Sequence, residues 1–145
     1  MKDILIAVVV LILILGLFWF VSTRDRTEEL PDNNMETEEL RVETLREGEG
    51  EEAQNGDTLT VHYTGMLEDG TVFDASLERG TPFEFVLGVG LVIEGWELGM
   101  LGAKVGEVRR LTIPPHLGYG EVEVGNGLIP ANSTLIFDVE VLEIN

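Results

Sequence analysis

The chain has 145 residues, enough for one compact domain and an additional segment, and 44% of them are hydrophobic. Its 27 acidic residues against nine Lys and Arg give a formal net charge of −18, which excludes a basic surface for nucleic acid or anionic lipid. The absence of cysteine excludes disulfides, thiol catalysis and zinc–thiolate sites.

Residues 1–21 contain an uninterrupted apolar run, Ile4 to Val21, which predicts a single membrane-spanning helix. A helix of this length would extend roughly 27 Å, close to the ~30 Å hydrocarbon core of a bilayer. Trp19 and Phe20 end the run, where aromatic rings favour the membrane interface. A cleaved signal peptide is one alternative, although no Ala-x-Ala-like site follows, and a buried helix is another.

The flanks of the run give opposing indications of orientation. Lys2 precedes it and Arg24 and Arg26 follow it, so the count of basic residues slightly favours a cytoplasmic C-terminal side. A tail of only three residues before the run is instead typical of a signal anchor, which leaves the bulk of a protein outside. We therefore predict a single-pass membrane protein whose domain is extracytoplasmic.

Residues 22–39 are charged and poor in apolar side chains, which predicts an acidic flexible tether. From residue 40 onward, short alternating runs between turn signals are typical of β-strands. The expected strand segments are 41–45 (at an edge), 58–64, 71–76, 82–87, 107–115 and 133–144.

Two further patterns complete the predicted fold. The alternation of the last segment slips at Leu142, as a bulge would cause. The spacing of Trp96 and Met100 predicts one short helix over 94–101. The sequence therefore predicts an α+β domain over residues 40–145, in which the helix covers the apolar face of an antiparallel sheet of about five strands.

The polar residues have no spacing that indicates a catalytic triad, a metal site or a phosphate-binding loop. His62 and His116 lie far apart, and we expect His62 to be solvated on the outer face of its strand. Gly88-Val-Gly90 lacks the third glycine of a dinucleotide-binding motif. No cofactor or metal is therefore expected.

The remaining candidates are aromatic: Tyr63, Phe73, Phe83, Phe85, Trp96, Tyr119 and Phe137. These rings could simply fill the core. However, Gly95 and Gly99 flank Trp96 where a strand turns into the helix, and glycine lets the backbone approach a ring closely. A concave apolar site is built in this way, so Trp96 could also form the floor of a pocket.

Five segments resemble one family in order and spacing: VHYTGMLEDGTVFDAS, RGTPFEF, VIEGWELGM, VGEVRRLTIPPHLGYG and LIPANSTLIFDVEVLEI. They are similar to the FKBP family of peptidyl-prolyl cis–trans isomerases, the immunophilins that bind FK506 and rapamycin. The resemblance covers roughly residues 40–145. It implies a five- to six-stranded antiparallel sheet wrapped around one short helix.

The resemblance also implies a site. Trp96 would be the pocket floor, and the walls would be Tyr63, Phe73, Phe83, Val92, Ile93, Ile129 and Phe137. Asp74 would be the acidic group of the pocket, paired with Arg79, while Tyr119 and the Ile93 N–H would bind the substrate backbone. Of these, Asp74, Tyr119, Phe73, Tyr63 and Phe137 would be catalytic, and the others, with Leu128 at the rim, would bind substrate.

The expected function is therefore a prolyl isomerase that assists protein folding, with Pro-containing polypeptides as substrates and FK506/rapamycin-type macrolides as possible ligands. The alternative is a non-catalytic module that recruits a Pro-containing segment of a membrane partner; a holdase is disfavoured because no chaperone domain is inserted. The altered loop Glu121–Gly127 lacks a histidine found in many relatives, which puts macrolide affinity in doubt. Because the tether is too short for a dimerising helix, we expect a monomer.

Overall fold

The computed structural model describes residues 38–145. The predicted membrane anchor and nearly all of the predicted tether therefore lie outside the described residues. Between residues 38 and 145, none of the helices combines the length and the apolar composition that crossing a membrane requires.

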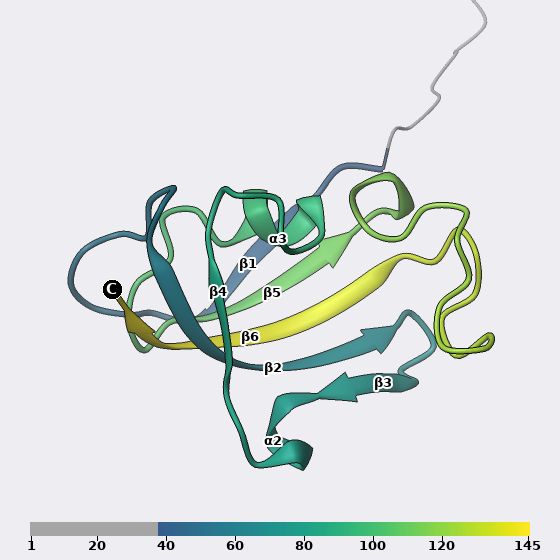
Figure 1. Cartoon of the computed structure of the whole chain (residues 1–145), viewed down its shortest axis with the longest axis horizontal. Coiled ribbons are helices and arrows are strands. Elements are labelled where there is room, and N and C mark those ends of the chain that lie inside the picture. Colours follow the sequence, from purple (N-terminus) through teal and green to yellow (C-terminus); the bar gives the residue numbers. More distant parts are fainter. Residues whose placement is uncertain (1–37) are drawn as a thin grey trace, which may run out of the picture. The chain divides into compact units, whose positions relative to one another are not determined.

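Six strands form one antiparallel sheet, whose order is β1-β5-β6-β2-β3, with β4 paired to the first half of β2 (Figure 1). The strands are β1 (Arg41–Arg46), β2 (Thr58–Leu67), β3 (Val72–Ala75), β4 (Phe83–Val86), β5 (Val108–Ile113) and β6 (Leu135–Ile144). The helices are α2 (Ser76–Arg79), α3 (Glu94–Gly99) and the 3₁₀ helix η1 (Pro115–Leu117). The predicted antiparallel sheet with a short helix is thus confirmed, and β1 lies at the predicted edge.

The predicted bulge lies in β6. Thr60 of β2 pairs with Glu143, whereas the next residue, Val61, pairs with Val141, so that Leu142 has no partner across the two strands. An extra residue reverses the alternation beyond it, which is why the apolar phase of the sequence slips at this position.

Two short helices were not predicted from the sequence. Helix α2 has four residues and ends at Gly80, which adopts a left-handed conformation with φ of 67°. Such a φ is unstrained for glycine, so the chain reverses there at little cost. Four residues are too few to display a helical period, and the predicted strand 71–76 shares only Ser76 with this helix.

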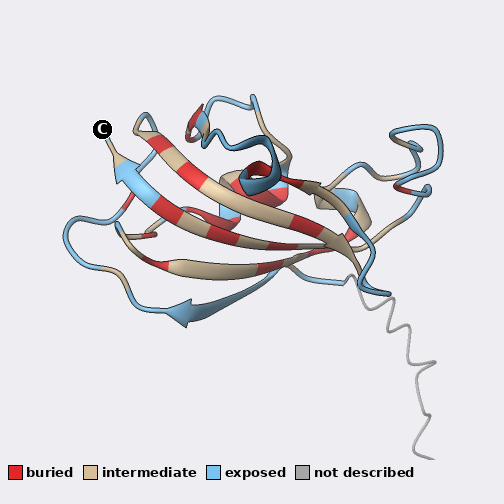
Figure 2. Ribbon diagram, turned by 90° about the horizontal axis from the view of Figure 1, so that it is seen from below, coloured by how far each residue is buried: buried red, intermediate tan, exposed pale blue. Residues whose placement is uncertain are grey.

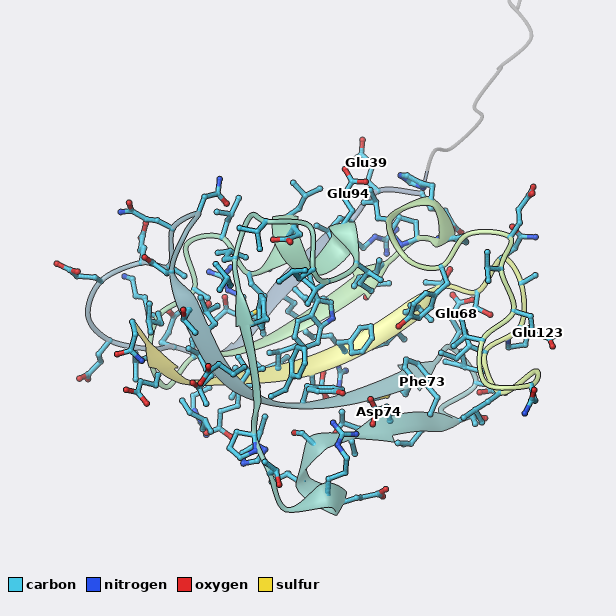
Figure 3. The ribbon with its side chains drawn as sticks, viewed as in Figure 1. Glu39, Glu68, Phe73, Asp74, Glu94 and Glu123 are labelled. Carbon is cyan, nitrogen blue, oxygen red and sulfur yellow. The ribbon has the colours of Figure 1, made fainter. Side chains whose placement is uncertain are left out.

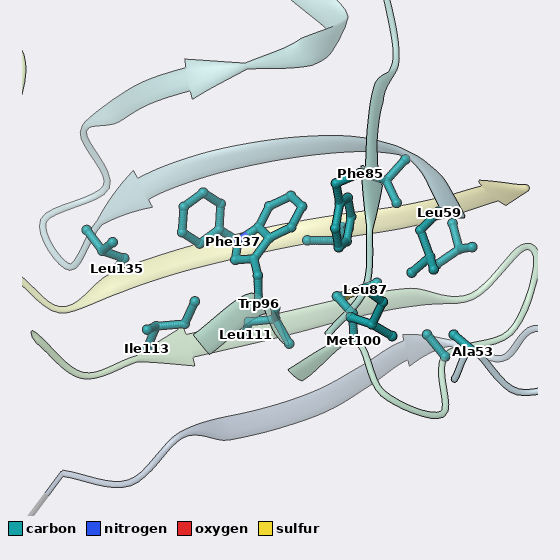
Figure 4. Packing of buried hydrophobic residues seen from close by; sticks show 14 of the residues in the cluster. Ala53, Leu59, Phe85, Leu87, Trp96, Met100, Leu111, Ile113, Leu135 and Phe137 are labelled. Carbon is teal, nitrogen blue, oxygen red and sulfur yellow. The ribbon is translucent and has the colours of Figure 1, made fainter. Parts of the chain in front are cut away.

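The core lies between the sheet and α3. Buried residues alternate with more exposed ones along β2 and β6, as the banded strands in Figure 2 show. Figure 4 shows these side chains interleaved with those of α3. The largest fully buried side chains are Leu59, Val61, Leu87, Met100, Leu111, Ile113, Leu135, Val139 and Val141.

Helix α3 packs on β5 through glycine. A Cβ on Gly95 would overlap the side chain of Ile113, and one on Gly99 would lie 2.8 Å from Leu111. The two glycines are four residues apart and face the same way, as do the two β5 residues. The helix backbone therefore lies directly on the β5 side chains. Six residues with two glycines do not form a stable helix alone, so this contact holds α3 together.

One carboxylate is buried between β1, β5 and the preceding turn. Glu107 is 4% exposed and accepts hydrogen bonds from Arg109 Nε at 2.6 Å, the Lys104 backbone N–H at 2.8 Å and Thr44 Oγ1 at 3.2 Å. Arg109 also donates to two backbone carbonyls at the end of α3. Burial alone would raise the pKa of Glu107, but these donors outweigh it and hold the pKa below its usual value.

Replacing Glu107 should destabilise the domain in a pH-dependent way. Glu107→Gln is expected to lower the free energy of unfolding by roughly 3 kcal/mol at pH 7, because Arg109 then lacks its charge partner. A carboxylate with a lowered folded pKa stabilises the protein above its unfolded pKa, and this contribution is lost as pH falls through the folded pKa. Denaturant unfolding at pH 7 and pH 3 should therefore show a larger acid loss in the parent than in the variant. Equal losses would contradict the assignment.

Candidate active site

A pocket with a volume of about 390 Å³ opens between the sheet and α3. Its lining residues are Tyr63, Phe73, Asp74, Phe83, Leu91, Val92, Ile93, Trp96, Tyr119 and Phe137. They come from β2, β3, β4, β6, α3 and the loops before α3 and after η1. The size and the mainly apolar lining suit a small apolar group with its flanking backbone.

Trp96 forms the floor and belongs to the core at the same time. Its side chain is only 4% exposed, yet it lines the pocket. Its ring meets Tyr63 at 5.2 Å between centroids, Phe137 at 5.3 Å and Phe83 at 6.0 Å, each edge to face. This is a favoured geometry for aromatic pairs, and it fixes each ring by its neighbours. Core and pocket floor are therefore one structure.

A second bulge brings Phe73 and Asp74 to the same pocket. In β3, Asp74 pairs with Gly65 of β2 and Val72 pairs with Met66, so Phe73 is the extra residue. Consecutive residues of a regular strand point to opposite faces, whereas a bulge re-aims one of them. Figure 3 shows both side chains directed from β3 toward β2. The sequence alternation gave no sign of this bulge in so short a strand.

Gly65 makes room for two rings of the pocket wall. A Cβ at this position would lie 2.7 Å from ring carbons of both Phe73 and Phe137. These two rings cross edge to face at 5.5 Å over the bare backbone of β2. Gly65 is thus a site-forming residue that sequence reasoning missed, although it stands inside one of the five family-like segments.

Three polar side chains form a linked group at the pocket wall. The Tyr63 hydroxyl donates to Asp74 Oδ2 at 2.5 Å, and Arg79 donates to Asp74 Oδ1 and, at 2.9 Å, to the Tyr63 oxygen. The guanidinium carbon of Arg79 also lies 5.6 Å from the centre of the Tyr63 ring. Burial and the Asp74 carboxylate raise the pKa of Tyr63, although Arg79 opposes them. The Asp74 charge is therefore compensated and fixed in place.

Tyr119 also lines the pocket and lies in the loop after η1. Burial and the negative charge of Asp74 raise the pKa of its phenol. Both tyrosines of the pocket are therefore protonated at neutral pH, and the Tyr119 hydroxyl is available as a hydrogen-bond donor.

The loop before α3 is held by a carboxylate that sequence reasoning also missed. Glu97 on α3 accepts hydrogen bonds from the backbone N–H groups of Gly88 and, at 2.8 Å, Gly90. The Ile93 carbonyl accepts hydrogen bonds from the backbone N–H groups of Trp96 and Glu97, which fixes the first turn of α3. These bonds place the loop that carries Val92 and Ile93.

Nine of the predicted site residues line the pocket: Tyr63, Phe73, Asp74, Phe83, Val92, Ile93, Trp96, Tyr119 and Phe137. Arg79 does not line it but contacts two residues that do. Leu128 and Ile129 are outside the lining: Leu128 is 48% exposed, and Ile129 is buried in the core beside its bridge partner Val124. Leu91 lines the pocket and was not predicted.

His62 differs from its predicted solvated state. It lies on the outer face of β2, as expected, but is half-buried, with Nδ1 2.9 Å from the Ser76 hydroxyl. The unpredicted helix α2 covers this position and supplies the serine. Among residues 38–145, no group of three or more His, Asp and Glu side chains is arranged to hold a metal ion.

Asp74 should control the titration of both pocket tyrosines. Because its negative charge contributes to the raised pKa of each, Asp74→Asn is expected to lower the pKa of Tyr63 and of Tyr119. NMR titration with ¹³C-labelled tyrosine would measure both. Glu84→Gln, on the exposed face of β4, is the matched control and should leave both values unchanged. An unaltered Tyr119 pKa in the Asp74 variant would contradict this electrostatic coupling.

Comparison with known proteins places this site in a family. A sequence model described as FKBP-type peptidyl-prolyl cis-trans isomerase matches residues 49–142. FK506-binding protein 2 of Yarrowia lipolytica is 59% identical over 95 residues, which are 66% of this chain and 65% of that protein. FK506-binding protein 1A of Neurospora crassa is 54% identical over 106 residues, or 72% of this chain and 88% of that protein.

The fold gives the same result. The crystal structure of AtFKBP13 superposes with a TM-score of 0.67 at 40% identity, covering 73% of this chain and 93% of that one. The aromatic pocket, the sheet that supports it and these relatives agree, and the chain therefore belongs to the FKBP-type peptidyl-prolyl cis–trans isomerases, with a domain that has the isomerase function of that family.

Proposed function

We propose that the whole chain is a membrane-tethered prolyl isomerase, which assists the folding of proteins outside the cytoplasm and catalyses rotation in the pocket above Trp96. The observation that supports this most strongly is the pocket itself. It combines an aromatic floor and walls with a compensated carboxylate and a protonated tyrosine hydroxyl. Rotation about a peptide bond needs no more than such groups.

The apolar lining is the source of the rate enhancement. The X–Pro bond resists rotation by ~18–20 kcal/mol because amide resonance must be broken, and turning without a catalyst takes tens to hundreds of seconds. The planar amide is more dipolar than the twisted one, so water stabilises the planar form. A pocket of aromatic rings replaces that water and disfavours the planar form relative to the twisted one.

The polar groups hold the substrate while its bond rotates. Tyr119 and Ile93 both line the pocket, which supports the proposal that the Tyr119 hydroxyl and the Ile93 N–H bind backbone carbonyls on either side of the proline. Asp74, fixed by Tyr63 and Arg79, acts through its charge and by orienting the wall, not as a proton donor. Lowering the barrier by ~5–6 kcal/mol would give about four orders of magnitude in rate.

The proposed ligands follow from the pocket and from the relatives. Pro-containing polypeptides are the substrates, and macrolides of the FK506 and rapamycin type are ligands, because two of the relatives are FK506-binding proteins. Leu128 and the loop Glu121–Gly127 lie outside the pocket lining. Their departures from the family pattern therefore bear on macrolide affinity and substrate preference more than on the rate of rotation.

Turnover of a short peptide tests the proposed catalysis. The full-length chain in detergent should accelerate cis–trans exchange of an Ala-Leu-Pro-Phe peptide, measured without a coupling protease by NMR exchange spectroscopy. Phe73→Ala and Asp74→Leu should each lower kcat/KM at least tenfold, because the first removes an aromatic part of the pocket wall and the second removes the charge that binds Tyr63 and Arg79. Glu84→Gln should retain the parent rate. Binding of the peptide or of rapamycin without turnover would instead support a recruitment module, and neither binding nor turnover would contradict both.

The membrane part of the proposal rests on the sequence of residues 1–39. The apolar run supports a single-pass anchor, the acidic tether supports a domain that stands away from the lipid surface, and the short tether supports a monomer.

The lack of cysteine provides a direct test of topology. A single cysteine introduced as Asn145→Cys should react with a membrane-impermeant maleimide in intact bacterial cells that express the full chain. Protection until the cells are lysed would contradict the extracytoplasmic placement. Release of the protein from membranes by salt or carbonate would contradict the anchor.

A further inference from the structure

A second cavity adjoins the pocket above Trp96. It has a volume of about 410 Å³ and is lined by Val72, Phe73, Asp74, Ala75, Glu78 and Arg79. We name this cavity the β3–α2 groove. Phe73 and Asp74 line both spaces, so one wall separates the groove from the pocket in which an X–Pro bond would lie. A polypeptide seated in the pocket therefore has the groove next to it.

The groove is bounded by an edge strand. All four residues of β3 line it, and within residues 38–145 β3 pairs with β2 alone. The outer edge of such a strand has backbone N–H and C=O groups without a strand partner, which is a common way of holding an extended peptide. Val72, at the start of β3, is 48% exposed and presents an apolar surface beside this edge.

The groove has one uncompensated charge. Arg79 is bound by Asp74 and by the Tyr63 hydroxyl, so these charges offset one another. Glu78 is exposed on α2, and the ion pairs found among residues 38–145 do not include it. The side chain that remains available to a ligand in the groove is therefore a carboxylate.

From these observations we propose that the β3–α2 groove is an extension of the substrate site. The groove holds substrate residues that flank the X–Pro bond. Glu78 selects substrates in which the residue lying in the groove is Lys or Arg. The proposal rests on the proposed function and specifies its substrate class. The occupant of the groove is a basic segment of the same substrate polypeptide, because the groove shares a wall with the pocket and Glu78 is negatively charged. An extended chain advances ~3.3 Å per residue, so a basic residue two to four positions from the proline can span the shared wall.

The test uses pairs of nine-residue peptides centred on Leu-Pro. One pair has Lys or Gln three residues before the proline, and the other has Lys or Gln three residues after it. The full-length chain should turn over one of the two Lys peptides roughly two- to fivefold faster than its Gln partner, the range expected for an exposed ion pair. The preference should weaken as salt concentration rises.

Two charge-reversal variants separate the groove from the general acidity of the chain. Glu78→Lys should abolish the preference for the Lys peptide, whereas Glu84→Lys, which makes the same change of charge on β4, should retain it. A preference that persists in Glu78→Lys, or that disappears equally in both variants, would overturn the proposal, as would the absence of any preference in the parent. Rates for the short Ala-Leu-Pro-Phe peptide are measured in parallel. If the parent does not turn that peptide over, the proposed function fails, which is a different result from the loss of charge selection.

Discussion

The packing of a glycine face of α3 against β5 is the contact on which the site depends. Because Gly95 and Gly99 carry no side chain over Ile113 and Leu111, the helix backbone lies directly on the sheet. From that position Trp96 reaches the rings of β2, β4 and β6 and closes the floor of the pocket. A methyl group at either glycine would lift the helix and separate the floor from its walls. Arg109 of β5 adds a polar contact at the end of the same helix, so apolar and polar interactions of one strand jointly fix it.

The walls are placed by departures from regular strand geometry. The bulge at Phe73 turns two consecutive side chains to one pocket, and the bare backbone at Gly65 lets the rings of Phe73 and Phe137 lie close to β2. The hydrogen bonds among Tyr63, Asp74 and Arg79 then hold these polar side chains to one another at the wall, so that they do not fill the apolar pocket. The pocket is therefore an assembly of small local exceptions on a regular sheet, and each exception has an identifiable packing reason.

Each sequence signal needs a certain number of residues to be detected, and this explains which elements the sequence predicted and which it did not. Alternation with a period of two is a local property, so it located the strands and also the bulge at Leu142. Helix α2 has only four residues and leaves no period to detect, so the sequence did not predict that His62 is half-buried and lies beside Ser76 of this helix. The family resemblance supplied most of the pocket lining. It also placed Ile129 in the pocket wall, whereas the structure buries this residue in the core beside its bridge partner Val124. It did not include Leu91, an exposed loop residue with no pattern of its own.

The glycine face of α3 also has a consequence for how the domain loses and gains its site. A helix of six residues with two glycines has no stability of its own, so its amide protons should exchange with solvent only in openings that also release β5. No partly unfolded form that has lost β5 can keep the floor of the pocket. The pocket is thus formed only in molecules that keep α3 packed on β5, and a ligand that fills the pocket should stabilise this part of the sheet against opening. In this architecture the pocket exists only while the contact between α3 and β5 is intact.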